Sequence, residues 1–401
     1  MTSTALQVKT DNGVPRGRAS GSAQSVQNKA TSSPGLFDRA MALCLRFGIL
    51  DGFNRFADTW WLPKEGPLPL LPRKKTADCF QVLTYHRVNP NGSRFEIDTV
   101  PPGVFDQHMR CLAEHFSVLT IEEIVERVRE NRPLPPRCAA ITFDDGYADN
   151  FSFAHPILKA RGLQATFYLT TGSIGSGKVL WFDRVLQAFE HTTRDAALMP
   201  FQTDPVSLRT DDERCTAGFR ALNYLRTLPP GQSEKVMDGL FGELRSDAPS
   251  MDRSLMLNWD QVADMSRYGH RFGSHTVTHP ILSRLPFPEV ESEIMRSKRM
   301  IEEMTGRSVM TFAYPSGRAQ DYSADIVTML KRAGYAAAVT NTTFTVNSRH
   351  EDLFRLNRMR PWEQEVASFF FKLCWYKLLD SGDRPASPVA GSSGHVPGAS
   401  C

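Results

Sequence analysis

Four side chains capable of metal-assisted hydrolysis occur in two short motifs of the sequence. Asp144 and Asp145 stand side by side in Thr-Phe-Asp-Asp-Gly, directly after an apolar run. His275 and His279 occur in Gly-Ser-His-Thr-Val-Thr-His-Pro, which also follows a predicted strand. A carboxylate and two imidazoles suit a first-row metal ion and leave positions open for water. Such an ion lowers the pKa of bound water to about 7 and polarises a carbonyl, so the predicted chemistry is hydrolysis.

Each motif alone has a simpler interpretation. An Asp-Asp-Gly sequence is typical of solvated turns. Two histidines four residues apart also occur on ordinary surface helices, and we expect His275 and His279 to share one side of a helical turn. The two motifs together favour chemistry because each follows a predicted strand. Adjacent side chains in extended backbone point in opposite directions, so one aspartate would bind a cation while the other faces the substrate.

Alternating apolar runs and helical patterns predict the elements that hold these residues. The expected strands are 80–85, 138–143, 164–170, 271–275, 309–314 and 335–340. The expected helices are 148–161, 260–267, 288–305 and 322–333, each with a glycine at or soon after its end. Thr120 and Glu123 form a predicted capping box that opens a further helix. Repeated strand–helix units imply a parallel sheet or barrel, in which active sites gather at the carboxyl ends of the strands.

Composition divides the chain into segments. They are a disordered tail at 1–35, an amphipathic helical lead-in and linker at 36–75, an α/β domain at 76–362, an aromatic-rich helix at 363–380 and a second disordered tail at 381–401. Residues 173–257 are rich in charge and turn residues and interrupt the strand–helix rhythm. They predict a helical subdomain inserted into the α/β domain.

The helical patterns at 36–62 and 366–379 carry many apolar side chains. Such helices lie in a membrane interface or pack on the main domain, and packing is the commoner outcome. No stretch approaches the roughly 20 apolar residues of a membrane-spanning helix. The N-terminus also lacks the apolar core of a secretory signal. We therefore expect a cytoplasmic location, with peripheral contact at the inner face of the membrane as an open alternative.

Charge and cysteine content restrict the partners and cofactors. The chain of 401 residues has a formal net charge of +3 and no dense block of lysine and arginine, so we expect no nucleic acid partner. The 7 cysteines are scattered and form no C-x-x-C pair, which predicts neither a disulfide framework nor a thiolate zinc site. The oligomeric state is not predicted.

A glycine-rich segment follows the strand predicted at 164–170. Residues Gly172 to Val179 resemble a nucleotide-binding P-loop but end in valine where that motif needs a hydroxyl, so a Gly/Ser loop after a strand is a sufficient explanation. Trp181, Phe182 and Phe189 follow this loop. We expect them to anchor the inserted helices, with stacking of Trp181 on a sugar ring as the alternative.

The pair of motifs resembles the polysaccharide deacetylase family, also called the NodB-homology family or carbohydrate esterase family 4. The likeness covers about residues 80–170 and 255–360. It implies a distorted (β/α)7 barrel, an α/β fold, that removes N- or O-acetyl groups from sugars.

The resemblance also implies a role for each motif residue. Asp144 would be the general base, and Asp145, His275 and His279 would hold a divalent metal. Zn²⁺ is the first expectation, with Co²⁺, Ni²⁺ or Mn²⁺ as alternatives.

A third motif, Phe-Ala-Tyr-Pro-Ser-Gly at 312–317, corresponds to a wall of the family's substrate groove. The resemblance implies that Tyr314, Pro315 and Ser316 lie against the substrate. The backbone N–H of Ser316 would donate to the oxyanion of the reaction.

Two positions depart from the family pattern. Ala313 stands where an arginine often tethers the catalytic base, and the last motif has no histidine in the place of the general acid. His86 follows the first predicted strand, at the expected catalytic face. We hypothesise that His86 is the general acid and that Arg358 replaces the missing tether. For His86, a strand-end histidine bonded to the backbone is the open alternative.

The predicted function is removal of N-acetyl groups from an amino-sugar-containing poly-, oligo- or lipid-linked saccharide, as in exopolysaccharide biosynthesis. Two alternatives stay open. One is a catalytically impaired, carbohydrate-binding scaffold in a glycan-assembly system. The other is a deformylase of a lipid-linked amino sugar, which would share the same centre.

Overall fold

The computed structural model describes residues 78–245, 254–341 and 346–379. The predicted tails at 1–35 and 381–401 and the lead-in at 36–75 lie outside the described residues.

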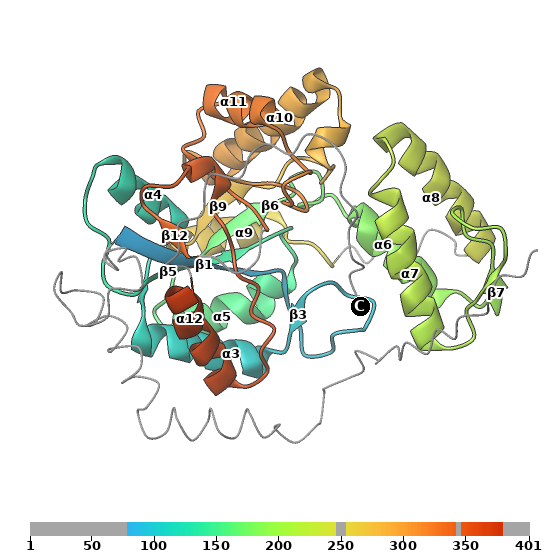
Figure 1. The fold of residues 1–401 in the computed structure, drawn as a ribbon, viewed down its shortest axis with the longest axis horizontal. Helices are drawn as coiled ribbons and strands as arrows, with labels where there is room; N and C mark the ends of the chain where they lie inside the picture. The colour runs from blue at the N-terminus through green and yellow to red at the C-terminus, as the bar shows by residue number, and fades with distance from the viewer. Residues whose placement is uncertain (1–77, 246–253, 342–345, 380–401) are drawn as a thin grey trace, which may run out of the picture. The chain divides into compact units, whose positions relative to one another are not determined.

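A largely parallel sheet forms the centre of the described chain (Figure 1). Its order is β11 (Ala337–Val339), β10 (Thr311–Ala313), β9 (Arg271–Ser274), β6 (Thr166–Leu169), β5 (Cys138–Phe143), β1 (Cys79–Tyr85) and β12 (Asn347–Ser348). The short β4 (Ser117–Val118) pairs with the start of β5, and β12 runs antiparallel to β1. All the other pairings are parallel. Every residue of β5 is buried, as its continuous apolar sequence predicts for a strand covered on both faces.

Residues 356–359 connect the two ends of the parallel sheet. On one side their backbone pairs with β11 and the residue after it, through hydrogen bonds of 2.8 and 3.0 Å. On the other side it pairs with β1 through hydrogen bonds of 2.9 and 2.7 Å. This segment therefore acts as a seventh parallel member and closes the sheet into a distorted barrel. The predicted fold class is confirmed.

Helices surround the barrel near the positions that the sequence predicts. They are α3 (Pro102–His115), α4 (Ile121–Arg129), α5 (His155–Ala160), α9 (Trp259–Tyr268), α10 (Phe287–Thr305) and α11 (Ala324–Arg332). The capping box of Thr120 and Glu123 opens α4 as predicted. The helix predicted at 148–161 instead begins with a π-helical turn at Asn150–Ala154. This wide turn includes the buried Asn150, whose amide donates to the His86 carbonyl at 2.9 Å and supports the chain after β1.

The segment between β6 and β9 has a hydrophobic core of its own. Its helices α6 (Trp181–His191), α7 (Asp211–Leu225) and α8 (Pro230–Leu244) lie beside one another (Figure 1). A two-stranded hairpin of β7 (Ala196–Ala197) and β8 (Val206–Ser207) joins α6 to α7. The helices enclose an apolar cluster separate from the main core, including Leu186, Phe189, Leu222 and Leu240. These helices and their hairpin thus occupy the region where the sequence predicts an inserted helical subdomain.

The aromatic-rich helix α12 (Val366–Leu379) packs on α3. Phe369, Phe370 and Leu373 are fully buried and belong to the main core. The Phe369 ring stacks on His108, with the ring centroids 4.0 Å apart. The described side chains of α12 therefore pack on the main domain, one of the two alternatives for this helix. The helical pattern at 36–62 lies outside the described residues. No helix in the described ranges is long and apolar enough to cross a membrane.

The packing of α12 gives a test of stability. Replacing Phe369 by alanine should lower the free energy of unfolding by about 3–5 kcal/mol, the usual cost of removing a buried phenylalanine side chain. Urea unfolding followed by circular dichroism measures this change. Phe287→Ala is the matched control because that ring is 52% exposed, and it should cost much less. Equal unfolding midpoints for wild type and Phe369→Ala would show that α12 does not pack on the barrel.

Candidate active site

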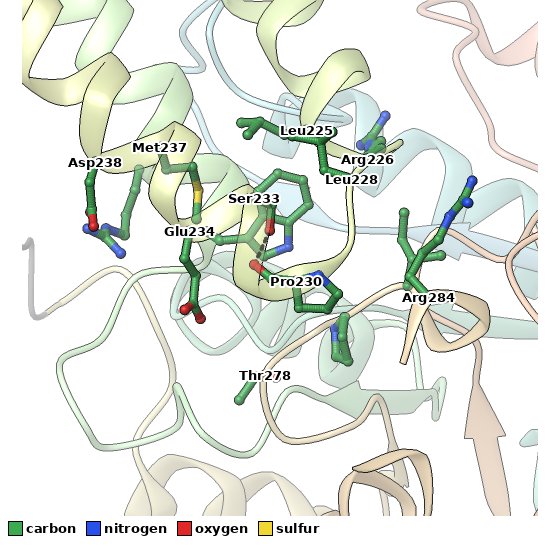
Figure 2. Close-up of a pocket in the computed structure, with 14 residues that line it drawn as sticks. Leu225, Arg226, Leu228, Pro230, Ser233, Glu234, Met237, Asp238, Thr278 and Arg284 are labelled. Atoms are coloured by element: carbon green, nitrogen blue, oxygen red, sulfur yellow. Dashed lines mark hydrogen bonds between the residues drawn. The ribbon is translucent and has the colours of Figure 1, made fainter. Parts of the chain in front are cut away.

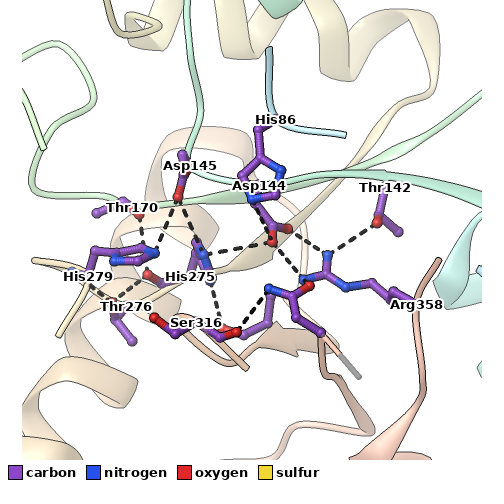
Figure 3. A network of polar contacts seen from close by, with 12 residues as sticks. His86, Thr142, Asp144, Asp145, Thr170, His275, Thr276, His279, Ser316 and Arg358 are labelled. Carbon is purple, nitrogen blue, oxygen red and sulfur yellow. Dashed lines mark hydrogen bonds and ion pairs between the residues drawn. The ribbon is translucent and has the colours of Figure 1, made fainter. Parts of the chain in front are cut away.

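The carboxyl ends of the barrel strands bring the predicted site residues together (Figure 3). His86 follows β1, and the aspartate pair follows β5. His275 follows β9, and Ser316 lies shortly after β10. The closing segment 356–359 contributes Arg358. This arrangement is the one expected of an α/β barrel, in which residues from several strand ends share one site.

Asp145, His275 and His279 form a cluster of potential metal ligands. Asp145 Oδ1 lies 3.5 Å from His275 Nε2 and 3.4 Å from His279 Nε2. One ligand atom from each residue lies within 4.8 Å of the others. Asp145 Oδ1 is buried and has no hydrogen-bond partner in the described part of the chain. A buried, unpaired carboxylate oxygen facing two imidazole nitrogens fits a bound cation.

The electrostatics of this cluster agree with that fit. Burial and the charge of Asp144 raise the pKa of Asp145. The ionised Asp145 carboxylate therefore lacks a neighbouring positive charge strong enough to stabilise it. Burial lowers the pKa of both His275 and His279, which keeps their imidazoles neutral. Neutral imidazoles are the form that binds metals. A bound cation would also supply the positive charge that stabilises the ionised Asp145 carboxylate.

A backbone carbonyl fixes the orientation of His275. The Nδ1 atom of His275 lies 2.8 Å from the carbonyl oxygen of Ala313. A carbonyl only accepts, so Nδ1 carries the proton and Nε2 presents its lone pair towards Asp145. Ala313, the position where the sequence lacks the usual tethering arginine, thus supports a ligand histidine through its main chain.

The two histidines do not share a helical turn, so that prediction is wrong. Residues 275–279 form a loop in which Thr276 and His279 have φ values of +70° and +59°. Glu293 on α10 holds the loop, because its carboxylate accepts from the Val277 N–H at 2.6 Å and the Thr278 N–H at 3.0 Å. The loop geometry, rather than helical periodicity, brings the imidazoles together, with ring centroids 4.7 Å apart.

Tight turns place Asp145 and Ser316. Asp145 has a φ of +74°, and the Gly146 N–H donates across it to the Asp144 carbonyl at 2.9 Å. Ser316 has a φ of +61°, and a bond of 2.7 Å from the next N–H to the Pro315 carbonyl closes the same kind of turn. Left-handed backbone in residues other than glycine costs about 1–3 kcal/mol at each position and is concentrated at functional sites.

Arg358 holds Asp144 through two parallel hydrogen bonds. Its Nη1 donates to Asp144 Oδ1 at 2.7 Å and its Nη2 to Oδ2 at 2.6 Å. The remaining donors are also used, on Thr340 O, Thr142 Oγ1 and Asn341 Oδ1. Burial would raise the pKa of Asp144, but the charge and hydrogen bonds of Arg358, together with the nearby His275 and His86, hold that pKa well below the ordinary value. Asp144 is therefore an ionised, fixed carboxylate beside the ligand cluster.

His86 lies between two carboxylates. Its Nε2 is 3.8 Å from Asp144 Oδ2, and its Nδ1 is 3.6 Å from Asp98 Oδ2. The ring forms no backbone hydrogen bond within the described residues, unlike the alternative that the sequence left open. Burial lowers the pKa of His86 to about 4, and the two carboxylates only partly oppose this shift. At neutral pH the ring is thus uncharged, and it lies beside Asp144 without forming a hydrogen bond to it.

Of the third motif, only Ser316 is placed to reach a ligand. Its N–H has no acceptor among the described residues, and its carbonyl accepts from the Asn341 amide at 3.2 Å. Tyr314, which the resemblance places at the substrate groove, has its side chain in the core. That ring is fully buried, stacks on Tyr322 and donates to the Phe354 carbonyl at 3.1 Å, so it belongs to the core. Pro315 is buried as well.

The P-loop-like segment supports the histidine loop instead of presenting free amides. The N–H groups of Gly172, Ser173 and Gly175 donate to protein carbonyls at 2.8, 3.0 and 2.9 Å. One of these carbonyls belongs to Val277, between the two histidines. A phosphate-binding loop needs such N–H groups unoccupied, so this segment is not built for a nucleotide.

Several supporting residues escape prediction from the sequence. Glu293, Asn341 and Asp98 act through contacts between segments far apart in the chain, and no motif marks them. The same is true of Asp183 on α6, which accepts from the Tyr147 hydroxyl at 2.9 Å and has a pKa raised to about 7 by burial.

Several known proteins are similar to this chain. The protein YxkH of Bacillus subtilis (strain 168), which carries the name of a polysaccharide deacetylase, is 23% identical over 301 residues, covering 75% of this chain and 74% of YxkH. The Streptococcus pyogenes deacetylase PplD, solved in complex with acetate, matches with a TM-score of 0.46 and 22% identity, over 70% of this chain and 92% of PplD. IcaB from Ammonifex degensii matches with a TM-score of 0.48 and 19% identity, over 73% of this chain and 97% of IcaB.

The sequence model of one family matches more than half of the chain. Described as "Polysaccharide deacetylase", it covers residues 131–338, which include both aspartates and both histidines. The chain therefore belongs to the polysaccharide deacetylase family of hydrolases.

Proposed function

We propose that this protein is a metal-dependent hydrolase that removes N-acetyl groups from an amino-sugar-containing saccharide. The observation that carries the proposal is the pairing of two differently held carboxylates at one strand end. Asp144 is bound by Arg358, and Asp145 faces two imidazoles. Two adjacent acids with separate environments can take separate roles, one as a base and one as a ligand.

The ligand cluster would hold a divalent cation, and its nitrogen and oxygen donors suit Zn²⁺ first, with Co²⁺, Ni²⁺ or Mn²⁺ as alternatives. When bound, such an ion polarises an acetyl carbonyl and makes water a better nucleophile. Asp145, His275 and His279 supply the donor atoms. The hydrogen bond from His275 Nδ1 to Ala313 keeps one of these donors aimed at the cation position.

Asp144 would act as the general base. Arg358 keeps this carboxylate ionised and fixes both of its oxygens, so it can accept a proton from the attacking water without changing position. The bidentate contact therefore positions the base and replaces the tether that the family often places two residues before Pro315.

His86 would return the proton to the substrate. The ring is neutral in the free protein, so it must first receive the proton that Asp144 took from water. His86 Nε2 lies 3.8 Å from Asp144 Oδ2, beyond hydrogen-bond range, so that transfer requires a closer approach of the two groups or one bridging water. His86 would then protonate the nitrogen that leaves as the C–N bond breaks, giving an amine and acetate. The Ser316 N–H, which has no acceptor in the described chain, would donate to the oxyanion.

Metal removal tests the ligand cluster. A chelator should abolish acetate release from N-acetylglucosamine oligomers, and added Zn²⁺ should restore it. Asp145→Asn and His275→Ala should also lower the bound metal measured by plasma mass spectrometry, whereas the exposed control His350→Ala should not. Acetate release that persists in chelator, or full metal content in both variants, would contradict this assignment.

The ion pair between Arg358 and Asp144 should show as a coupling between the two side chains in the free energy of unfolding. Arg358→Gln should destabilise the protein by about 3–5 kcal/mol, since it leaves a buried carboxylate unpaired. The double variant Asp144→Asn/Arg358→Gln should lose less than the sum of the two single changes, because neither partner then carries a buried charge. Urea unfolding of the four proteins gives the coupling, with the exposed Arg355→Gln as control. Additive losses would show that the two side chains do not interact.

His86 has a kinetic test. His86→Gln should lower kcat about 10²–10⁴-fold, as expected for loss of a general acid, with a much smaller change in KM. Acetate release under saturating substrate measures this effect, and the exposed control His191→Gln should behave as wild type. Activity of His86→Gln near that of wild type would remove His86 from the mechanism.

A further inference from the structure

A cavity of about 400 Å³ lies next to the ligand cluster, between the helices after β6 and the loop that carries His279 (Figure 2). Trp181 on α6 and the connection between α7 and α8 line one side of it. Thr278 and Pro280, the neighbours of His279 in sequence, line the other. Its size falls in the range of roughly 300–1,000 Å³ typical of small-molecule sites.

Trp181 joins this cavity to the candidate active site. Its indole N–H donates to the His279 carbonyl at 3.2 Å, while its ring lines the cavity. Phe182, the next residue, packs edge-on against the His279 ring, with the centroids 5.0 Å apart. A molecule that fills the cavity would thus contact residues adjacent in sequence to His279, a potential metal ligand.

Five charged side chains line the cavity, namely Arg184, Arg226, Arg284, Glu234 and Asp238. Figure 2 shows Arg226 and Arg284 on one side of the cavity and Glu234 and Asp238 on the other. Among the residues that the structure describes, neither Arg226 nor Arg284 forms an ion pair within 4.0 Å. The cationic side is therefore not neutralised by the acids that share the cavity.

Arg226 has an unpaired donor. Its Nε atom is buried without a hydrogen-bond partner in the described chain, and its Nη1 donates to Asn223 Oδ1 at 3.5 Å. Burial lowers the pKa of Arg226, and the charge of Arg318 lowers it further, whereas Asp321 opposes these effects. Asp321 also interacts electrostatically with Arg284. This one carboxylate is therefore shared by the guanidinium groups of Arg226, Arg284 and Arg318.

A buried guanidinium donor that lacks an acceptor is costly and calls for a partner. Arginine side chains that converge on a cavity bind phosphate and carboxylate groups, because their planar fork matches two oxygens of either anion. Arg226 is partly exposed and Arg284 is exposed, so an anion that enters from solvent can reach both guanidinium groups.

We propose that this cavity binds an anionic group, a phosphate or a carboxylate, that the acetylated saccharide carries beside the sugar that loses its acetyl group. Arg226 and Arg284 bind the anion, and Trp181 contacts the adjoining sugar. The preferred substrate is then an acidic saccharide rather than a neutral N-acetylglucosamine chain. This inference rests on the proposed deacetylase function and specifies its substrate class.

The test compares acetate release by the full-length, metal-loaded protein from three probes. They are neutral N-acetylglucosamine oligomers, N-acetylglucosamine 1-phosphate and N-acetylmuramic acid, which carries a carboxylate. Wild type should favour at least one anionic probe in kcat/KM. Arg226→Gln and Arg284→Gln should reduce that preference at least about tenfold, the loss expected when one partner of a charged hydrogen bond is removed. The anionic probe whose preference falls more identifies the anion.

Two controls make the result specific. Arg226→Lys should keep part of the preference, since it retains the charge without the fork. Arg332→Gln, an exposed arginine on α11, should leave all three values unchanged. A wild type with no anionic preference, or an unchanged preference in both glutamine variants, would overturn the proposal.

A binding measurement separates this inference from the proposed function. Calorimetric titration of the metal-loaded protein with inorganic phosphate requires no turnover. Phosphate should bind wild type at least about tenfold more tightly than Arg226→Gln. If this difference is found and no probe releases acetate, the deacetylase function fails and the anion site stands. If acetate is released and phosphate binds both proteins equally, the anion site fails alone.

Discussion

The buried ion pair between Arg358 and Asp144 connects the closure of the barrel to the chemistry of the site. Arg358 lies on the segment 356–359, whose backbone bonds join the two ends of the sheet. Its guanidinium reaches across the barrel to a carboxylate at the end of β5. An isolated carboxylate at this depth would be protonated or would destabilise the fold. Barrel closure therefore provides the charge that keeps Asp144 ionised, and the site is complete only when the last parallel segment is in place.

The second constraint is the backbone around the ligand cluster. Asp145, Thr276, His279 and Ser316 all have positive φ values. Hydrogen bonds to the Glu293 carboxylate and the Ala313 carbonyl hold the histidine loop and its first imidazole. These conformations cost free energy in isolation and persist because the surrounding barrel fixes them. The cost is offset by packing elsewhere, including the buried aromatic face of α12. The result is a rigid set of donors whose positions do not depend on a flexible surface loop.

Much of this arrangement could be predicted from the sequence. The strand–helix rhythm predicted a parallel sheet or barrel, because apolar runs and glycine-terminated helices report local structure directly, and the family resemblance implied the barrel. The two motifs identified Asp144, Asp145, His275 and His279, and the lack of an arginine at Ala313 led to Arg358 as its replacement. The helical turn predicted at 275–279 is wrong, and the burial of the Tyr314 ring was not predicted. Both depend on tertiary contacts, with Glu293 in one case and the Phe354 carbonyl in the other, and spacing along the chain carries no information about them.

The central claim is that Asp145 binds a metal ion while Asp144 stays on Arg358 as the base. An anomalous difference map recorded at the zinc edge from crystals of the zinc-loaded protein tests this most directly. We predict one peak bound by Asp145, His275 and His279, with both Asp144 oxygens still accepting from Arg358. A peak bound by Asp144, or zinc found only away from these residues, would contradict the account.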